Sequence, residues 1–165
     1  MPAKKTIERA EEDKREGKSP STQAGEFVRE EIDKIRKGKH GARSAKQAIA
    51  IGLSEARRAG VDLKPPPKGR LSEKSQKSAE SAYEKGQRHE PVSPARSRAR
   101  EKALKKESTE STSHEALSKQ ARSAAKSRSA AEHSAAGKKA VKTKGHEELS
   151  AAGKKAARTR KRNEA

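Results

Sequence analysis

The sequence predicts a mostly α-helical protein: a small antiparallel helical hairpin plus a helix-prone, largely disordered basic tail. Large apolar side chains are dense only between residues 21 and 63. Over the whole chain 28% of residues are hydrophobic and 39% are charged. This composition offers too little apolar surface to offset the ordering entropy of 165 residues, so we expect one small core and a long disordered remainder.

The net charge of +19 indicates a partner of opposite sign. The excess grows toward the C-terminus, where residues 114–165 hold 14 Lys or Arg and five Asp or Glu. A sustained basic tail is typical of proteins that bind polyanions. No apolar secretory segment or membrane-spanning run is visible, so we expect a cytoplasmic protein with no membrane partner.

Residues 1–20 are predicted to form a charged N-terminal helix or arm. The segment TIERAEEDKRE (6–16) favours a helix, with Thr6 as its N-cap and Gly17 as its stop. Ile7 is its only large apolar residue, so we expect this helix to fray or to dock weakly on its neighbour.

Residues 21–64 are predicted to form the hairpin. Its first helix, about 22–37, carries an apolar stripe made of Ala24, Val28, Ile32 and Ile35. Its second helix begins at a capping box, Ser44 to Gln47, and ends before Gly60. Small residues follow one side of that helix, which lets two backbones approach closely and gives Gly52 a packing role.

Residues 65–113 are predicted to be a linker broken by prolines, with short helices near 72–85 and 95–107. Residues 114–161 are three basic repeats of 16 residues, which we expect to be disordered or to become helical on binding. In an unbroken helix, 16 residues advance the side chains by about 160° beyond four turns. Equivalent cations would then point in nearly opposite directions, and the repeat would spread positive charge around the axis.

The residue types do not predict an enzyme, a cofactor or a metal centre. No cysteine is present, and the five histidines are not spaced to share a helix face. The serines lack a recognisable His and acid partnership on a rigid scaffold.

Cations without intervening acids surround the start of the second hairpin helix. Here Gly38 and Gly41 would let a phosphate approach the backbone, and the helix N-terminus favours anions. Together with the tail, this predicts a set of nucleic-acid-binding residues: Arg36, Lys37, Lys39, Arg43, Lys46, Lys138, Lys139, Lys142, Lys154, Lys155, Arg158, Arg160, Lys161 and Arg162.

The outward side of the second hairpin helix predicts a possible interface. Ile51 is its one large apolar residue, and three polar side chains beside it could also reach base edges. This side consists of Gln47, Ile51, Ser54 and Arg58.

The segment KHGARSAKQAIAIGLSEARRAGV, followed by prolines, resembles the core of an uncharacterised bacterial family of small basic proteins of unknown function. The likeness covers roughly residues 7–67 and implies a bacterial origin, but no activity. The tail, with SAAGKKA and AARTRKR, is similar in composition to linker-histone tails and histone-like proteins, which implies nucleoid association.

These observations favour a non-enzymatic, sequence-nonspecific DNA-binding protein of the nucleoid. Contacts to phosphate do not separate DNA from RNA, so an RNA-associated or ribosome-associated factor is one alternative. A protein-interaction adaptor is the other, in which the hairpin binds a second copy or another protein and the tail keeps the chain in solution.

Overall fold

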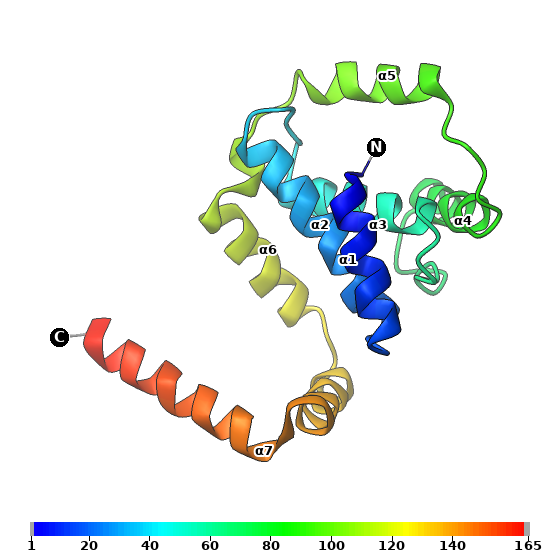
Figure 1. Ribbon diagram of the computed structural model, residues 1–165. Coiled ribbons are helices and arrows are strands. Elements are labelled where there is room, and N and C mark those ends of the chain that lie inside the picture. Colours follow the sequence, from blue (N-terminus) through cyan, green and yellow to red (C-terminus); the bar gives the residue numbers. More distant parts are fainter. Residues whose placement is uncertain (1, 164–165) are drawn as a thin grey trace. The chain divides into compact units, whose positions relative to one another are not determined.

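The computed structural model describes residues 2–163, and every regular element in that range is a helix (Figure 1). The predicted mostly α class is confirmed. The chain divides into two compact units, of which the first ends at Gln120 and the second begins at Ala121, within a helix. The elements are α1 (Lys4–Arg15), α2 (Pro20–Arg36), α3 (Ala45–Arg58), α4 (Glu73–Gln87), α5 (Pro94–Leu104), the 3-10 helix η1 (Glu110–Thr112), α6 (His114–Lys126) and α7 (Ala130–Asn163).

The hairpin of α2 and α3 forms the centre of the first unit. Ile35 packs with Ala48 near the connecting loop, whereas Phe27 and Ala56 share a core cluster at the other end, so the helices run antiparallel. The helices touch through Gly52, where an added Cβ would lie 2.6 Å from the Val28 Cα. The small residues of α3 thus permit the close approach that the sequence indicates.

The buried residues of α2 are Ala24, as the apolar stripe predicted, and a row of residues four apart: Gln23, Phe27, Glu31 and Ile35. Val28 and Ile32, which the apolar stripe placed inward, are only half-buried. The shift has a physical cause, because α2 packs against α1 on one side and α3 on the other. A helix held between two neighbours buries a wider arc than one that faces a single partner.

The first helix docks on α2 rather than fraying. Thr6 and Ala10 are both buried at this contact. The backbone N–H of Ala3, the N-cap residue, donates to both carboxylate oxygens of Glu30 at 2.9 and 3.1 Å. Thr6 is therefore not the N-cap but a buried residue within α1. The Glu30 carboxylate of α2 accepts the backbone N–H at the start of α1.

The fourth helix packs on α3, although the sequence predicted a linker here. Ala79, Ala82 and Gly86 are its buried residues, and a Cβ at Gly86 would overlap the Arg57 carbonyl. The Tyr83 hydroxyl donates to Asp62 Oδ1 at 2.6 Å. Small side chains replace large apolar ones at this contact, which is why hydrophobicity alone did not indicate it.

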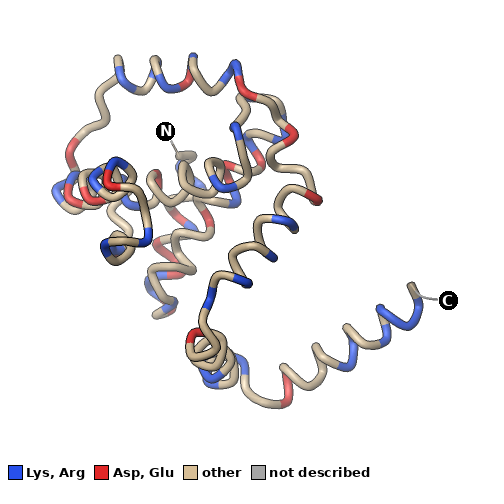
Figure 2. Tube along the Cα trace, turned by 180° about the vertical axis from the view of Figure 1, so that it is seen from behind, with Lys and Arg blue, Asp and Glu red and all other residues tan. Residues whose placement is uncertain are grey.

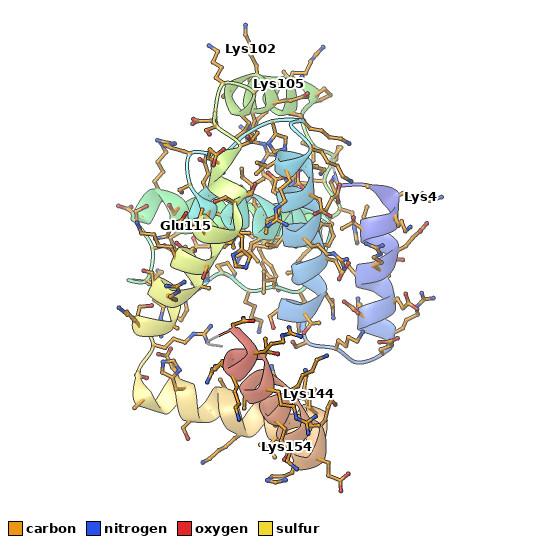
Figure 3. All side chains as sticks on the ribbon, turned by 90° about the vertical axis from the view of Figure 1, so that its left-hand side faces the viewer. Lys4, Lys102, Lys105, Glu115, Lys144 and Lys154 are labelled. Atoms are coloured by element: carbon orange, nitrogen blue, oxygen red, sulfur yellow. The ribbon has the colours of Figure 1, made fainter. Side chains whose placement is uncertain are left out.

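Residues 104–112 return to the hairpin loop after α5. Leu104 and Thr112 are buried, and η1 contacts both α2 and α3. Elsewhere α5 is largely exposed, and Lys102 points away from the packed helices, as does Lys4 of α1 (Figure 3). The 65–113 segment is therefore part of the first unit rather than a spacer.

In the second unit, residues 121–126 complete α6 and residues 130–163 form α7. Gly145 interrupts α7 with φ 75° and ψ 163°, so two helical stretches, 130–144 and 146–163, meet at a kink. The expected disorder of the tail is not confirmed, because the described residues of the repeats are mostly helical. None of the residues that the structure describes beyond 120 is fully buried, which agrees with helices formed by local propensity.

Candidate nucleic-acid interface

The loop between α2 and α3 is shaped by its first glycine. Gly38 has φ 69°, and its N–H donates to the Ile35 carbonyl at 2.9 Å. The Lys39 N–H donates to the Lys34 carbonyl at 3.0 Å. These two bonds close the C-terminus of α2 around one residue, Gly38, in the left-handed backbone conformation. Gly38 is therefore required by the turn itself.

Gly41 lies against the chain's own backbone. An added Cβ there would overlap the Glu107 carbonyl, and the Gly41 N–H donates to the Leu104 carbonyl at 2.9 Å. The Ala42 N–H donates to the Ser108 carbonyl at 3.0 Å. Residues 104–108 thus occupy the space that we expected a phosphate to approach. The N–H groups of Gly41 and Ala42 are therefore already used within the chain.

The five predicted loop cations, Arg36, Lys37, Lys39, Arg43 and Lys46, are all exposed. Arg36 also has a structural contact, because its Nε donates to the buried Thr112 carbonyl at 3.0 Å. At Arg43, the backbone N–H donates to Gln47 Oε1 at 2.8 Å, and the Gln47 backbone N–H donates to Ser44 Oγ, the N-cap, at 3.2 Å. The predicted cap is present, and it leaves the Arg43 and Lys46 side chains in solvent.

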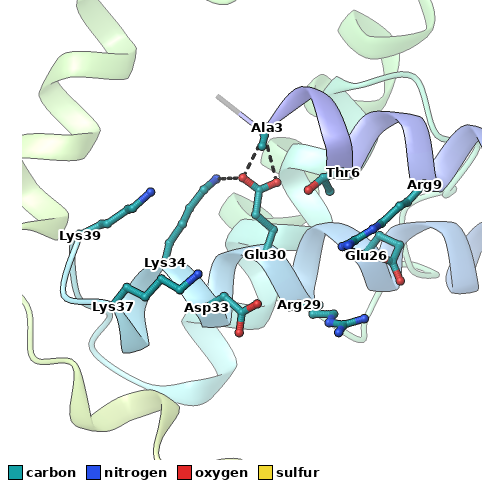
Figure 4. Close-up of a pocket in the computed structure, with 10 residues that line it drawn as sticks. All are labelled: Ala3, Thr6, Arg9, Glu26, Arg29, Glu30, Asp33, Lys34, Lys37 and Lys39. Carbon is teal, nitrogen blue, oxygen red and sulfur yellow. Dashed lines mark hydrogen bonds and ion pairs between the residues drawn. The ribbon is translucent and has the colours of Figure 1, made fainter.

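Lys37 and Lys39 border a groove of about 210 Å³ between α1 and α2 (Figure 4). The groove also contains acids, and Lys34 Nζ lies 2.7 Å from Glu30 Oε1. Burial acts to lower the pKa of Lys34, but the hydrogen bond to Glu30 and the nearby carboxylates outweigh it and raise that pKa. The groove is lined by five cations and three acids, so part of its positive charge is balanced.

The possible interface on α3 is partly covered by the chain itself. Arg58 Nη2 lies 3.3 Å from the carbonyl oxygens of both Glu90 and Pro91. Ile51 is half-buried and lines a cavity together with Leu104, Gln47 serves the helix cap, and Ser54 is half-buried. Residues that follow α4 therefore contact part of the side that we expected a partner to use, and its four residues remain half-buried.

The cavity beside Ile51 contains a buried carboxyl that the sequence did not indicate. Glu31 is 1% exposed, its Oε2 lies 3.6 Å from His40 Nε2, and its Oε1 has no hydrogen-bond partner. Burial, and then the field of Glu55, raise the pKa of Glu31. The sequence signal was the row of residues four apart on α2, in which Glu31 takes a core position.

In contrast to the first unit, the tail presents unbalanced charge. Between residues 121 and 163 there are 13 Lys or Arg and three Asp or Glu. Figure 2 shows the blue positions recurring along α7 with few red ones. All nine predicted tail residues are exposed: Lys138, Lys139, Lys142, Lys154, Lys155, Arg158, Arg160, Lys161 and Arg162.

Within residues 2–163, no group of three or more His, Asp or Glu side chains is placed to hold a metal ion. In the same range, no helix combines the length and apolar character needed to cross a membrane.

Residues 2–69 match a protein family of unknown function (DUF6496). The match covers α1, α2 and α3 and ends in the loop before α4. The resemblance to an uncharacterised family is thus confirmed for the N-terminal part, while α4 to α7 lie outside it. No curated protein and no solved structure matches the chain.

Proposed function

We propose that this protein binds nucleic acid without reading its sequence, does no catalysis, and associates with the bacterial nucleoid. The observation that carries the proposal is the exposed, unbalanced charge of residues 121–163. Lys and Arg side chains that contact phosphates release condensed counterions, which favours binding to any sequence. Duplex DNA is the proposed partner because it carries one negative charge per about 1.7 Å of helix axis, which rewards many phosphate contacts.

The first unit supports the tail as a folded anchor. Its own exposed cations, such as Lys39 and Lys46, add contacts at one end of the hairpin. Its surface charge is more balanced, with 29 Lys or Arg and 19 Asp or Glu between residues 2 and 120. The binding free energy is therefore assigned mainly to the tail.

Fluorescence anisotropy with a labelled 30-base-pair duplex tests the proposal. With about 6–10 phosphate contacts, affinity should fall on the order of 10³–10⁵-fold between 50 and 200 mM salt. Two duplexes of unrelated sequence should bind equally well. An affinity that does not change with salt would contradict the proposal, and tighter binding of structured RNA in competition would assign the protein to RNA instead.

A further inference from the structure

The helices of the tail coincide with its sequence repeats. The three repeats occupy residues 114–129, 130–145 and 146–161. Helix α6 ends at Lys126 and α7 begins at Ala130, so the first repeat has its own helix. Gly145, the last residue of the second repeat, separates the two helical stretches of α7. Each repeat therefore forms one helical stretch, and the next repeat starts a new one.

This segmentation changes where the cations point. In one unbroken helix the repeats would spread their charge around the axis. Because the helix breaks at each boundary, the regular rotation from residue to residue applies only within one stretch. At about 100° per residue, the cations of each stretch fall within an arc of about 120° or less. We call these three groups of side chains the cationic faces. They are Lys119, Arg122 and Lys126 in the first stretch, Lys138, Lys139 and Lys142 in the second, and Lys154, Lys155, Arg158, Lys161 and Arg162 in the third.

The other side of each stretch is small and apolar. Alanines dominate it, with Leu117, Val141 and Leu149 as its large residues. The remaining cation of each repeat lies outside the cationic faces: Arg128 follows the end of α6 at Lys126, whereas Lys144 and Arg160 lie on the opposite side of their stretches. Lys144 is paired with Glu148 across the kink at 3.8 Å. The predicted contact Arg160 thus belongs to the opposite side of its helix.

Acids and cations are also separated along each stretch. Glu115, Glu132 and the pair Glu147 and Glu148 lie at the helix starts, and the cations follow them. This order suits the helix dipole, which favours negative charge at the N-terminus and positive charge at the C-terminus. The repeat thus encodes a short stable helix as well as a charged face.

We propose that each repeat is a separate helical module that lays its cationic face along the phosphate backbone of duplex DNA. This proposal rests on the proposed function and specifies its contact surface. A stretch of 15 residues is about 22 Å long, which corresponds to about six or seven base pairs at 3.4 Å each. The break at Gly145 lets the second and third faces each be directed at DNA.

An anionic membrane is the competing partner for a basic amphipathic helix. Helices that lie in membranes bury large side chains such as Trp, Phe and Leu. Residues 121–163 contain Val141 and Leu149 as large apolar residues, and their other apolar residues are alanines. The apolar area available for insertion is small, so the geometry favours a phosphate backbone over a lipid surface.

Two triple variants of the full chain test the orientation with matched loss of charge. The face variant combines Lys126→Ala, Lys142→Ala and Arg158→Ala, and the control combines Arg128→Ala, Lys144→Ala and Arg160→Ala. Each removes one cation per repeat, and alanine retains helix propensity. Circular dichroism should show equal helicity for both variants.

The face variant should bind the 30-base-pair duplex on the order of 10²-fold more weakly at 100 mM salt, with its salt slope reduced by about 2.7. The control should lose less than about fivefold, because its cations only contribute at a distance that salt screens. Equal losses would overturn the assignment of the faces while leaving nucleic-acid binding intact.

Failure of the unchanged protein to bind the duplex would overturn the proposed function itself. Binding to vesicles of anionic phospholipid as tight as binding to DNA, at the same salt, would overturn the choice of partner. A face variant that loses duplex affinity but keeps its weak vesicle binding would support it.

Discussion

Gly52 of α3 lies directly against Val28 of α2, so that a Cβ at position 52 would come within 2.6 Å of the Val28 Cα. The helices are in backbone contact here, and this contact sets the distance between the two halves of the hairpin. Neither backbone can move away without disturbing the buried Phe27 beside it.

Gly52→Ala should therefore destabilise the first unit. The gain in helix propensity is about 1 kcal/mol, but overpacking two backbones costs about 1–3 kcal/mol and here has no flexible side chain to absorb it. Urea unfolding should show a net loss of stability. Gly153→Ala is the control, because no atom lies within 4 Å of its Cβ position, and it should leave the unfolding midpoint of the first unit unchanged.

Tyr83 offers a direct measure of whether α4 is docked. Its hydroxyl donates to Asp62, and this hydrogen bond raises the pKa of Tyr83 above its ordinary value of 10.0. Tyr83 is the one tyrosine of the chain, so absorbance near 295 nm reports it alone. Asp62→Asn should bring the pKa back toward 10.0.

Gly86→Ala should have the same effect on Tyr83 from a distance. A Cβ at position 86 would overlap the Arg57 carbonyl and push α4 off α3, which separates Tyr83 from Asp62. Gly25→Ala, at an exposed helical site with no neighbour within 4 Å, is the matched control. A raised Tyr83 pKa that survives Gly86→Ala would show that α4 docks differently.

Glu31→Gln should stabilise the first unit at neutral pH. Burial and Glu55 raise the pKa of Glu31, so the folded chain holds this proton more tightly than the unfolded chain does. Glu31 thus contributes favourably to folding stability at pH values below its ordinary pKa of about 4.5. This contribution is lost as the pH rises through the higher pKa of the folded chain.

The stability difference between Glu31→Gln and the unchanged protein should consequently be largest at pH 7 and vanish toward pH 4. Urea titrations at several pH values would measure it. Glu12→Gln, which removes one carboxylate at an exposed site on α1, is the charge-matched control. A Glu31→Gln variant that is less stable at pH 7 would mean that the His40 contact outweighs the cost of burial.

Gly145→Ala should join the two stretches of α7. Alanine at φ 75° is strained by about 1–2 kcal/mol, and relief comes from extending the helix through position 145. In the continuous helix the third cationic face would point about 160° away from the second. Helicity by circular dichroism should rise while duplex affinity falls.

Gly137→Ala, inside a helical stretch with no neighbour within 4 Å, is the control for Gly145→Ala. It should raise helicity slightly and leave affinity unchanged. Equal affinities for the two glycine variants would show that the break has no part in binding.

Local features of this fold were predictable because they depend on neighbouring residues in the sequence. The Ser44 cap and the packing role of Gly52 are of this kind. The cavity around Glu31 was not predictable, because residues of α5 and of the hairpin loop line it and they are distant from Glu31 in the sequence or outside its helix. Gly41 illustrates the same difficulty. A glycine among cations has the same local sequence whether a phosphate or the chain's own backbone lies against it.

The helix break in the tail has a sequence signal of its own. Gly137 and Gly153 stand in the repeated SAAGKKA and remain helical, whereas Gly145 precedes the acidic start of the third repeat. A glycine followed by acids marks a helix end and a new beginning. Lys126, Lys142 and Arg158 are equivalent residues of the three repeats. With this signal, Lys126 would join the predicted nucleic-acid-binding residues.

The kink at Gly145 has a kinetic consequence for the proposed binding mode. Modules that engage separately hold one another near the duplex at an effective concentration in the millimolar range. One module can then release and rebind while the others stay attached, and free DNA can occupy the phosphates it leaves. The protein should dissociate faster as competitor DNA is added, which a single rigid contact surface would not do.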